Sequence, residues 1–85
     1  MTAPNDPGDQ DTLARIHALV TEEHRLRELI QQGDSDPAGE RLRSVETQLD
    51  QCWDLLRQRR ALREAGADPD EASVRPADEV QRYLS

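Results

Sequence analysis

Apolar residues recur at steps of three and four along two long segments of the chain, and this is the period of an α-helix. The first segment carries Leu13, Ile16, Leu19, Val20, Leu26, Leu29 and Ile30. The second carries Leu42, Val45, Leu49, Cys52, Trp53 and Leu56. In the second segment the alternating steps persist over two heptads, which is typical of a coiled coil. The pattern therefore predicts two long amphipathic helices.

Residues that start and stop helices set the expected bounds of the first helix. Asp9 or Asp11 offers a side-chain oxygen to the free amide groups of a first turn. Gly33 suits the left-handed position that follows a last turn. We therefore expect the first helix over residues 11–32.

The second helix has a stronger start, because Asp36 precedes Pro37 and proline gives up no needed hydrogen bond in a first turn. Gly66 provides its end. The polar link between the helices is so short that they must lie antiparallel. Residues 11–66 are therefore expected to form an all-α, coiled-coil-like two-helix hairpin.

Both ends of the chain are acidic. Residues 1–10 contain prolines and a glycine with few apolar side chains, so we expect a disordered acidic leader. Residues 67–85 form an acidic tail, in which Asp68-Pro69 begins a capped single turn. A short helix is expected over residues 76–84, with Val80, Tyr83 and Leu84 on one side. Whether the tail docks on its own hairpin, docks on a second copy or stays free is open.

The chain is small for a stable domain. Its 85 residues are 34% hydrophobic and include two aromatic side chains, so the core of a single chain is marginal. The apolar arc of the first helix spans roughly 200°, which is wider than one neighbouring helix covers. We therefore expect a homodimer in which two hairpins pack as a four-helix bundle, in parallel or antiparallel orientation. The expected interface residues are Leu19, Glu23, Leu26 and Trp53.

Glu23 falls near the centre of the apolar arc of the first helix. A carboxylate there is either a buried functional acid or one half of an ion pair with Arg27 or Arg41 that fixes the register of the helices. We favour the ion pair, because a buried carboxylate costs several kcal/mol unless it is paired.

Four arginines gather toward the end of the second helix: Arg57, Arg59, Arg60 and Arg63. One interpretation is a cationic docking patch for an acidic partner protein. A second is that their aliphatic stems cover the end of the bundle. A third is pairing with acidic residues of the leader and tail, such as Asp9, Asp11 and Asp70. We favour the second and third, since charge runs are usually solvated or self-paired.

The net charge of the chain indicates which kinds of molecule it is expected to bind. Eleven basic against 18 acidic residues give a net charge of −7, which speaks against nucleic acid. There is no run of about 18 apolar residues, so we expect no membrane span. The single cysteine permits no internal disulfide and the start of the chain has no apolar targeting stretch, so we expect a cytoplasmic protein.

Metal, cofactor and nucleophile chemistry has little support. His24 and Glu28 have the i,i+4 spacing of shared ligands, but His17 lies too far along the helix to complete a site. Cys52 lies on the interior stripe, where burial makes a thiol unreactive. We therefore expect no metal, no cofactor and no catalytic residue.

The stretches LARIHALVTEEHRLRELI and LDQCWDLLRQRRALREAGADPDEASVRPADEVQRYL carry a family resemblance. They resemble short actinobacterial proteins grouped as a domain of unknown function, over nearly the whole chain from Thr12 to Leu84. The run QCWDLLRQRR, residues 51–60, is the most specific part. The resemblance implies a cytoplasmic actinobacterial source, which agrees with the use of arginine for every basic residue, and it implies no activity.

The stretch LRSVETQLDQCWDLLRQRRALREAG also resembles helical chorismate mutases. That resemblance implies cations that converge on a small dicarboxylate in a helical dimer, with Arg43 and Arg59 in the positions of two such arginines. The chain has no lysine for the usual ether contact, and its last helix is short. We therefore favour a non-enzymatic, homodimeric protein–protein interaction or regulatory module. A small-dianion enzyme and nucleic-acid contact through the arginines of the second helix are the alternatives.

Overall fold

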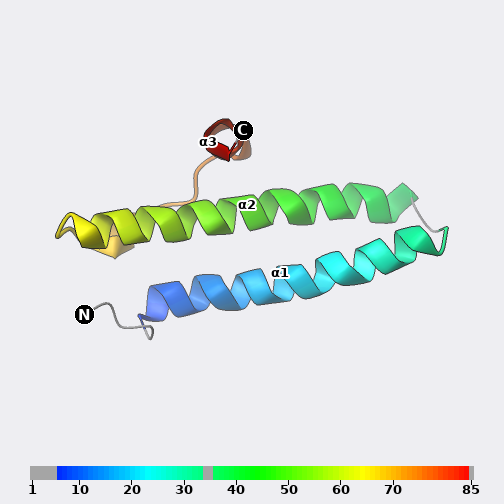
Figure 1. The fold of residues 1–85 in the computed structure, drawn as a ribbon, viewed down its shortest axis with the longest axis horizontal. Helices are drawn as coiled ribbons and strands as arrows, with labels where there is room; N and C mark the ends of the chain where they lie inside the picture. The colour runs from blue at the N-terminus through cyan, green and yellow to red at the C-terminus, as the bar shows by residue number, and fades with distance from the viewer. Residues whose placement is uncertain (1–5, 34–35, 85) are drawn as a thin grey trace.

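The structure is a computed structural model that describes residues 6–33 and 36–84, with backbone alone at 36 and 81–84. Its elements are α1 (Pro7–Gln31), α2 (Asp36–Glu64), the 3-10 helix η1 (Pro69–Glu71) and α3 (Ala77–Leu84). The helices α1 and α2 lie side by side and antiparallel, and α3 lies on the flank of α2 that faces away from α1 (Figure 1). The predicted hairpin with a short C-terminal helix is confirmed.

Local chemistry explains the ends of both long helices. Gly33 and Gly66 follow α1 and α2 with φ angles of +94° and +76°, a region that glycine enters without a Cβ clash. After α2, the amide of Ala67 donates to the carbonyl of Leu62 at 2.8 Å and closes the last turn. The link residues 34–35 lie outside the described residues.

The start of α1 differs from the predicted start. The helix begins at Pro7 rather than at residue 11, so residues 7–10 of the expected leader are helical. Asp6 is the N-cap, because its Oδ1 accepts hydrogen bonds from the amides of Gly8 at 2.9 Å and Asp9 at 3.3 Å. Pro7 occupies the first helical position, where its missing N–H costs nothing. Residues 1–5 of the expected leader lie outside the described residues.

The core is a narrow seam between α1 and α2. Both predicted apolar stripes supply it, and Val45 is completely buried. Cys52 is buried as expected. The buried seam residues are Ile16, Leu19, Leu26, Ala38, Val45, Leu49 and Cys52.

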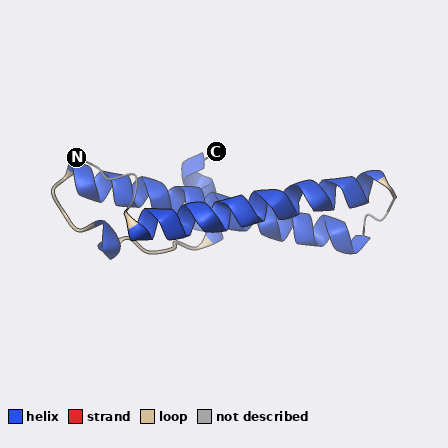
Figure 2. Cartoon of the chain, turned by 90° about the horizontal axis from the view of Figure 1, so that it is seen from below, coloured by secondary structure: helices blue, strands red, loops and turns tan. Residues whose placement is uncertain are grey.

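The hairpin is elongated and one helix thick. It measures 50 × 27 × 16 Å, and its radius of gyration is 15.1 Å, where a compact domain of this length has about 12 Å. Its accessible surface is 5963 Å², compared with about 5,100 Å² for a typical folded monomer of its mass. Seen edge-on, the two long helices cross at a shallow angle (Figure 2). The chain therefore exposes more surface than its size requires.

The tail docks on α2 of its own chain, which answers the question that the sequence leaves open. Gln58 Nε2 donates to the carbonyl of Ser73 at 2.8 Å, and Gln58 Oε1 accepts from the amide of Ser73 at 3.5 Å. Gln51 Nε2 donates to the carbonyl of Arg75 at 3.2 Å. Val80 of α3 then has no exposed surface. Polar contacts therefore hold the tail against α2 at Ser73 and Arg75, and the buried Val80 anchors α3.

Replacing Val80 with serine is expected to release α3, since it puts a hydroxyl in place of a fully buried side chain. Amide hydrogen exchange should accelerate over residues 77–84 while the amides of the hairpin keep their protection. Val74→Ser is the matched control, because Val74 is 61% exposed. Equal exchange in the two variants would contradict the docking of the tail.

Candidate functional site

Arg59 of α2 is nearly buried and binds two other segments of the chain. Its side chain is 7% exposed. The Nε atom donates to Oδ1 of Asp9 at 2.6 Å, and Nη2 donates to Oδ1 of Asp6 at 2.7 Å, both at the start of α1. The Nη1 atom donates to Oδ1 of Asp70 at 3.0 Å and to the carbonyl of Pro69 at 3.2 Å, both in η1. One guanidinium group therefore joins α1, α2 and η1.

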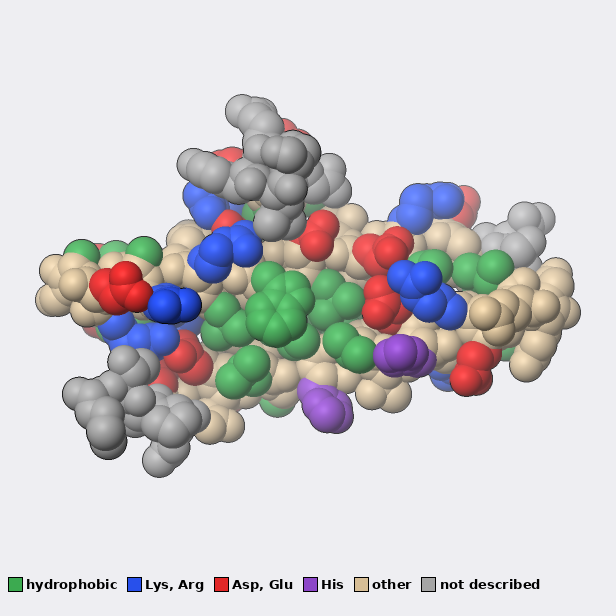
Figure 3. Space-filling model, viewed as in Figure 1, with side chains coloured by type: hydrophobic (Ala, Val, Ile, Leu, Met, Phe, Trp, Pro, Cys, Tyr) green, Lys and Arg blue, Asp and Glu red, His purple; other side chains and the backbone are tan. Residues whose placement is uncertain are grey.

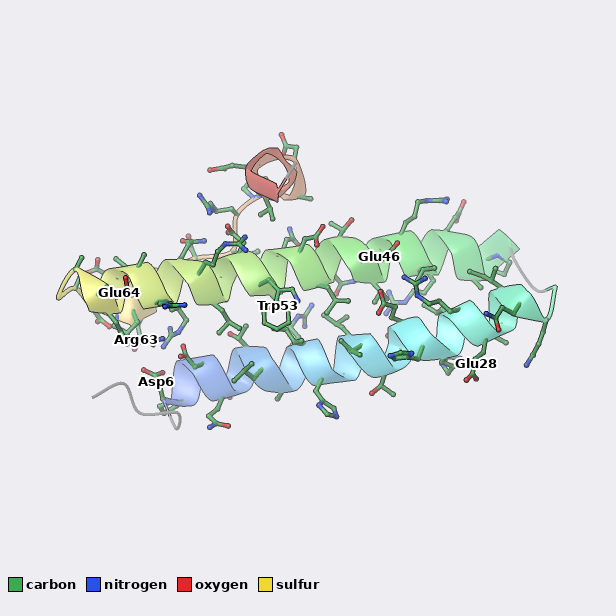
Figure 4. The ribbon with its side chains drawn as sticks, in the orientation of Figure 1. Asp6, Glu28, Glu46, Trp53, Arg63 and Glu64 are labelled. Carbon is green, nitrogen blue, oxygen red and sulfur yellow. The ribbon has the colours of Figure 1, made fainter. Side chains whose placement is uncertain are left out.

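Arg63, one turn further along α2, adds to the same cluster. Its Nη2 donates to Oδ2 of Asp9 at 2.8 Å, and its Nη1 lies 3.7 Å from Oδ2 of Asp6. Asp6 and Arg63 face each other between the ends of α1 and α2 (Figure 4). We call Asp6, Asp9, Arg59, Arg63 and Asp70 the arginine clasp. The anticipated acidic partners Asp9 and Asp70 take part in it, whereas Asp11 is exposed.

Two of the four arginines that were expected to form a docking patch for an acidic partner belong to the arginine clasp. Arg59 and Arg63 are engaged by carboxylates of their own chain, whereas the side chains of Arg57 and Arg60 are 52% and 78% exposed. The engagement of Arg59 also bears on the chorismate-mutase resemblance, because a small dianion would have to displace three carboxylates to reach it.

A second buried ion pair holds the tail. The side chain of Asp54 on α2 is 1% exposed. Arg75 donates to it through both Nε, at 2.8 Å from Oδ2, and Nη2. Gln58 Nε2 donates to the same carboxylate at 3.0 Å, and Arg57 Nη2 lies 3.7 Å from it. No local pattern in the sequence marks Asp54, because its main partner comes from the tail and only the fold brings the two residues together.

These contacts shift the ionisation of the acids. Hydrogen bonds from Arg63, with a smaller contribution from Arg59, hold the pKa of the Asp9 carboxyl below its ordinary value although burial opposes the shift. The hydrogen bonds from Arg75 lower the pKa of Asp54 in the same way. The hydrogen bond to Asp9 raises the pKa of Arg59. Both sites therefore hold charged partners at neutral pH.

Trp53 lies at the centre of an open face of the hairpin. It is 47% exposed, and Leu13 of α1 is 44% exposed. Apolar side chains gather over the middle of this face (Figure 3), and Trp53 sits between α1 and α2 there (Figure 4). We call this surface the Trp53 face. A tryptophan side chain buries 150–250 Å² when covered, so half of a large apolar side chain remains in water.

Two open hollows lie on either side of Trp53 along α2. The first, of about 550 Å³, is lined by Val20, Glu23, Glu46, Leu49, Asp50 and Trp53. The second, of about 450 Å³, is lined by Arg57, Gln58, Arg60, Ala61, Glu64 and Arg75. The rim of the first hollow is acidic, and the second is mainly basic.

The other expected interface residues are placed differently. Leu19 and Leu26 are 7% and 3% exposed, so α2 of the same chain already covers them. Glu23 is partly exposed and lies 3.4 Å from Arg27, one of the two arginines considered for it. Arg41, the other one, donates to Glu22 at 2.5 Å.

Neither a metal site nor a membrane span emerges from the described part of the chain. No group of three His, Cys, Asp or Glu side chains within it has a metal-binding arrangement. Within the same ranges, no helix combines the length and the apolar character needed to cross a bilayer.

The fold and these contacts define a class of small helical hairpin whose open end is closed by buried ion pairs. The family model described as "Protein of unknown function (DUF2630)" matches residues 8–85, and the chain belongs to this family. Uncharacterized protein Mb0922c of Mycobacterium bovis and uncharacterized protein Rv0898c of Mycobacterium tuberculosis are similar to it, each 56% identical over 79 residues. The match covers 91% of this chain and 91% of each relative. The resemblance to an actinobacterial family of unknown function is confirmed. No solved structure matches the chain.

Gly8 tests the clasp, because a Cβ atom there would lie 2.3 Å from Nη2 of Arg59. Gly8→Ala should destabilise the fold by about 1–3 kcal/mol, although alanine favours helix by about 1 kcal/mol. Gly39→Ala is the matched control, since nothing lies within 4 Å of a Cβ at Gly39, and it should stabilise. Thermal unfolding followed by circular dichroism measures both. Stabilisation by Gly8→Ala would contradict the clasp.

Acid should weaken the fold through Asp9 and Asp54. Each has a folded-state pKa below the ordinary value of about 3.9. Their contribution to the free energy of unfolding is therefore complete above that value and is lost as the pH falls through the folded-state pKa. The Tm should drop steeply below about pH 4.

Asp54→Asn should lower the free energy of unfolding at pH 7 by about 2 kcal/mol, because Arg75 loses the buried carboxylate that accepts two of its hydrogen bonds. The same variant should also have a flatter dependence of Tm on acid, since one of the titrating groups is gone. Thermal unfolding at pH values from 7 to 3 measures both effects. If Tm depended on pH in Asp54→Asn as it does in the wild-type chain, Asp54 would not be one of the titrating groups that weaken the fold in acid.

Proposed function

We propose that the protein is a homodimeric protein–protein interaction module whose contact surface is the Trp53 face. The observation that carries the proposal is a half-exposed tryptophan in the middle of an apolar surface, on a hairpin one helix thick. Domains bury their apolar faces between at least two layers of secondary structure. Tryptophan is also enriched among the central, energetically dominant residues of interfaces.

The dimensions of the hairpin suit such an interface. Its broad side measures 50 × 27 Å. A side of these dimensions is large enough to supply the roughly 800 Å² of surface that a standard interface buries on each partner. Stacking two hairpins on this side adds the missing second layer and yields a four-helix bundle. The seam residues Leu19 and Leu26 stay inside each chain, so association requires no opening of the hairpin.

The two alternative functions have less support. A small-dianion site of chorismate-mutase type needs Arg59, whose donors face Asp6, Asp9 and Asp70. Nucleic-acid contact through the four arginines near the end of α2 retains Arg57 and Arg60 as its exposed groups, on a chain with a net charge of −7. Neither alternative accounts for the exposure of Trp53.

Trp53→Ser tests the proposal. Sedimentation equilibrium should show that the wild-type chain is a dimer at micromolar concentration. The variant should raise the dimer Kd at least about 30-fold, because truncation of one central aromatic residue costs about 2 kcal/mol or more and the homodimer contains two copies of it. Helicity should be retained, since Trp53 lies outside the buried seam.

Val74→Ser is the control, because Val74 is an exposed apolar residue of the tail and its replacement should leave the Kd unchanged. A wild-type chain that stays monomeric throughout the concentration series would contradict the proposal. So would a Trp53→Ser chain with the wild-type Kd.

A further inference from the structure

Charged residues lie on both sides of Trp53 along one exposed strip of α2, and the sign of their charge changes at the tryptophan. Glu46 and Asp50 precede the tryptophan, and Arg57 and Arg60 follow it. At 100° per residue these five positions lie within an arc of about 80°, so they share one strip of the helix surface. Between Glu46 and Arg60 the strip is acidic on the side of the hairpin turn and basic on the side of the open end, and Glu64 follows Arg60 on the same strip.

The charged side chains of this strip are accessible. The exposed fractions are 46% for Glu46, 52% for Arg57 and 78% for Arg60. Within the chain, Glu46 lies 3.4 Å from Arg27, and Arg60 donates to Glu64 at 2.9 Å. Exposed pairs of this kind contribute little, so exchanging them for contacts across an interface costs little.

We infer that the homodimer is antiparallel, with a two-fold axis that passes between the two copies of Trp53 and with the acidic half of each α2 facing the basic half of the other. Glu46 and Arg60 stand seven residues to either side of Trp53, so the axis places Glu46 opposite Arg60 of the partner subunit. Asp50 is three residues before Trp53 and Arg57 is four residues after it, so the same axis brings Asp50 close to Arg57 of the partner subunit. The acidic hollow of each chain then receives the arginines of the other. This inference rests on the proposed homodimer and supplies its geometry.

The charge pattern selects a second copy as the occupant of the face. A two-fold interface uses the same patch twice, so the patch must be complementary to itself. The section of the strip from Glu46 to Arg60 is antisymmetric in charge about an apolar centre and meets this requirement. A parallel arrangement would set Glu46 against Glu46 of the partner subunit and Arg60 against Arg60 of the partner subunit, and these like charges repel each other.

Two charge reversals, Arg60→Glu and Glu46→Arg, test the register. Each variant alone creates two like-charge contacts in its homodimer, so sedimentation equilibrium at low salt should show a Kd at least about tenfold above the wild-type value. An equimolar mixture of the two variants should recover the wild-type Kd, because each contact in the heterodimer again joins opposite charges. Arg57 is left unchanged in this test, since it also lies near the buried Asp54.

Arg25→Glu is the matched control. Arg25 is an exposed arginine of α1 outside the strip, and its reversal changes the net charge as Arg60→Glu does. Its Kd should stay within about twofold of the wild-type value. Circular dichroism should show wild-type helicity for every variant, because each substitution is at an exposed or partly exposed side chain.

The outcomes separate this inference from the proposed function. If the wild-type chain dimerises and both reversals leave the Kd unchanged, the hairpins meet in another register and the inference is overturned while the homodimer stands. Unchanged single variants whose mixture binds more tightly than wild type indicate the parallel arrangement and also overturn it. A monomeric wild-type chain removes the homodimer and the inference together.

Discussion

The buried charge of Arg59 is the constraint on which the rest of the structure depends. A guanidinium group that is 7% exposed is tolerated only when its donors are occupied. Asp6 and Asp9 arrive from α1, and Asp70 arrives from η1. The hairpin turn joins α1 and α2 at one end, and the clasp joins them at the other. The relative register of the helices is therefore fixed at both ends.

This register determines which surface of α2 remains open. The seam with α1 covers one side of α2, and the tail covers another through Asp54, Arg75 and Val80. The strip between these two sides carries Trp53, which points toward α1 from the middle of α2 (Figure 4), whereas α3 lies on the opposite flank of α2 (Figure 1). The exposure of Trp53 thus follows from how the remainder of the chain packs, and the second hairpin that we propose would match this face in shape and charge.

Short-range chemistry predicts much of the fold. The apolar stripes, the glycines that end the helices and the turn at Asp68-Pro69 are all found in the structure. The early start of α1 escapes prediction, because the prolines and glycine around Asp6 have the composition of a disordered leader. Asp6-Pro7 nevertheless has the same form as Asp36-Pro37, and this likeness is the available indication.

The ionic contacts are harder to predict. The sequence can nominate acidic partners for Arg59, but it contains 18 acidic residues and no local rule selects among them. Asp54 and Arg75 are 21 residues apart in sequence and meet only after the tail has folded back. The exposure of Trp53 has the same origin, since a residue at the edge of a stripe becomes buried or open according to where the neighbouring elements pack.

Trp53 is the single tryptophan of the chain, so its fluorescence reports directly on the central claim that this face is where two copies meet. The emission spectrum of the wild-type chain should be recorded over a dilution series. The account predicts emission at shorter wavelength in the dimer and a shift to longer wavelength at the concentration where the mass falls to that of a monomer. Emission typical of a water-exposed indole in a sample whose mass is that of a dimer would contradict it.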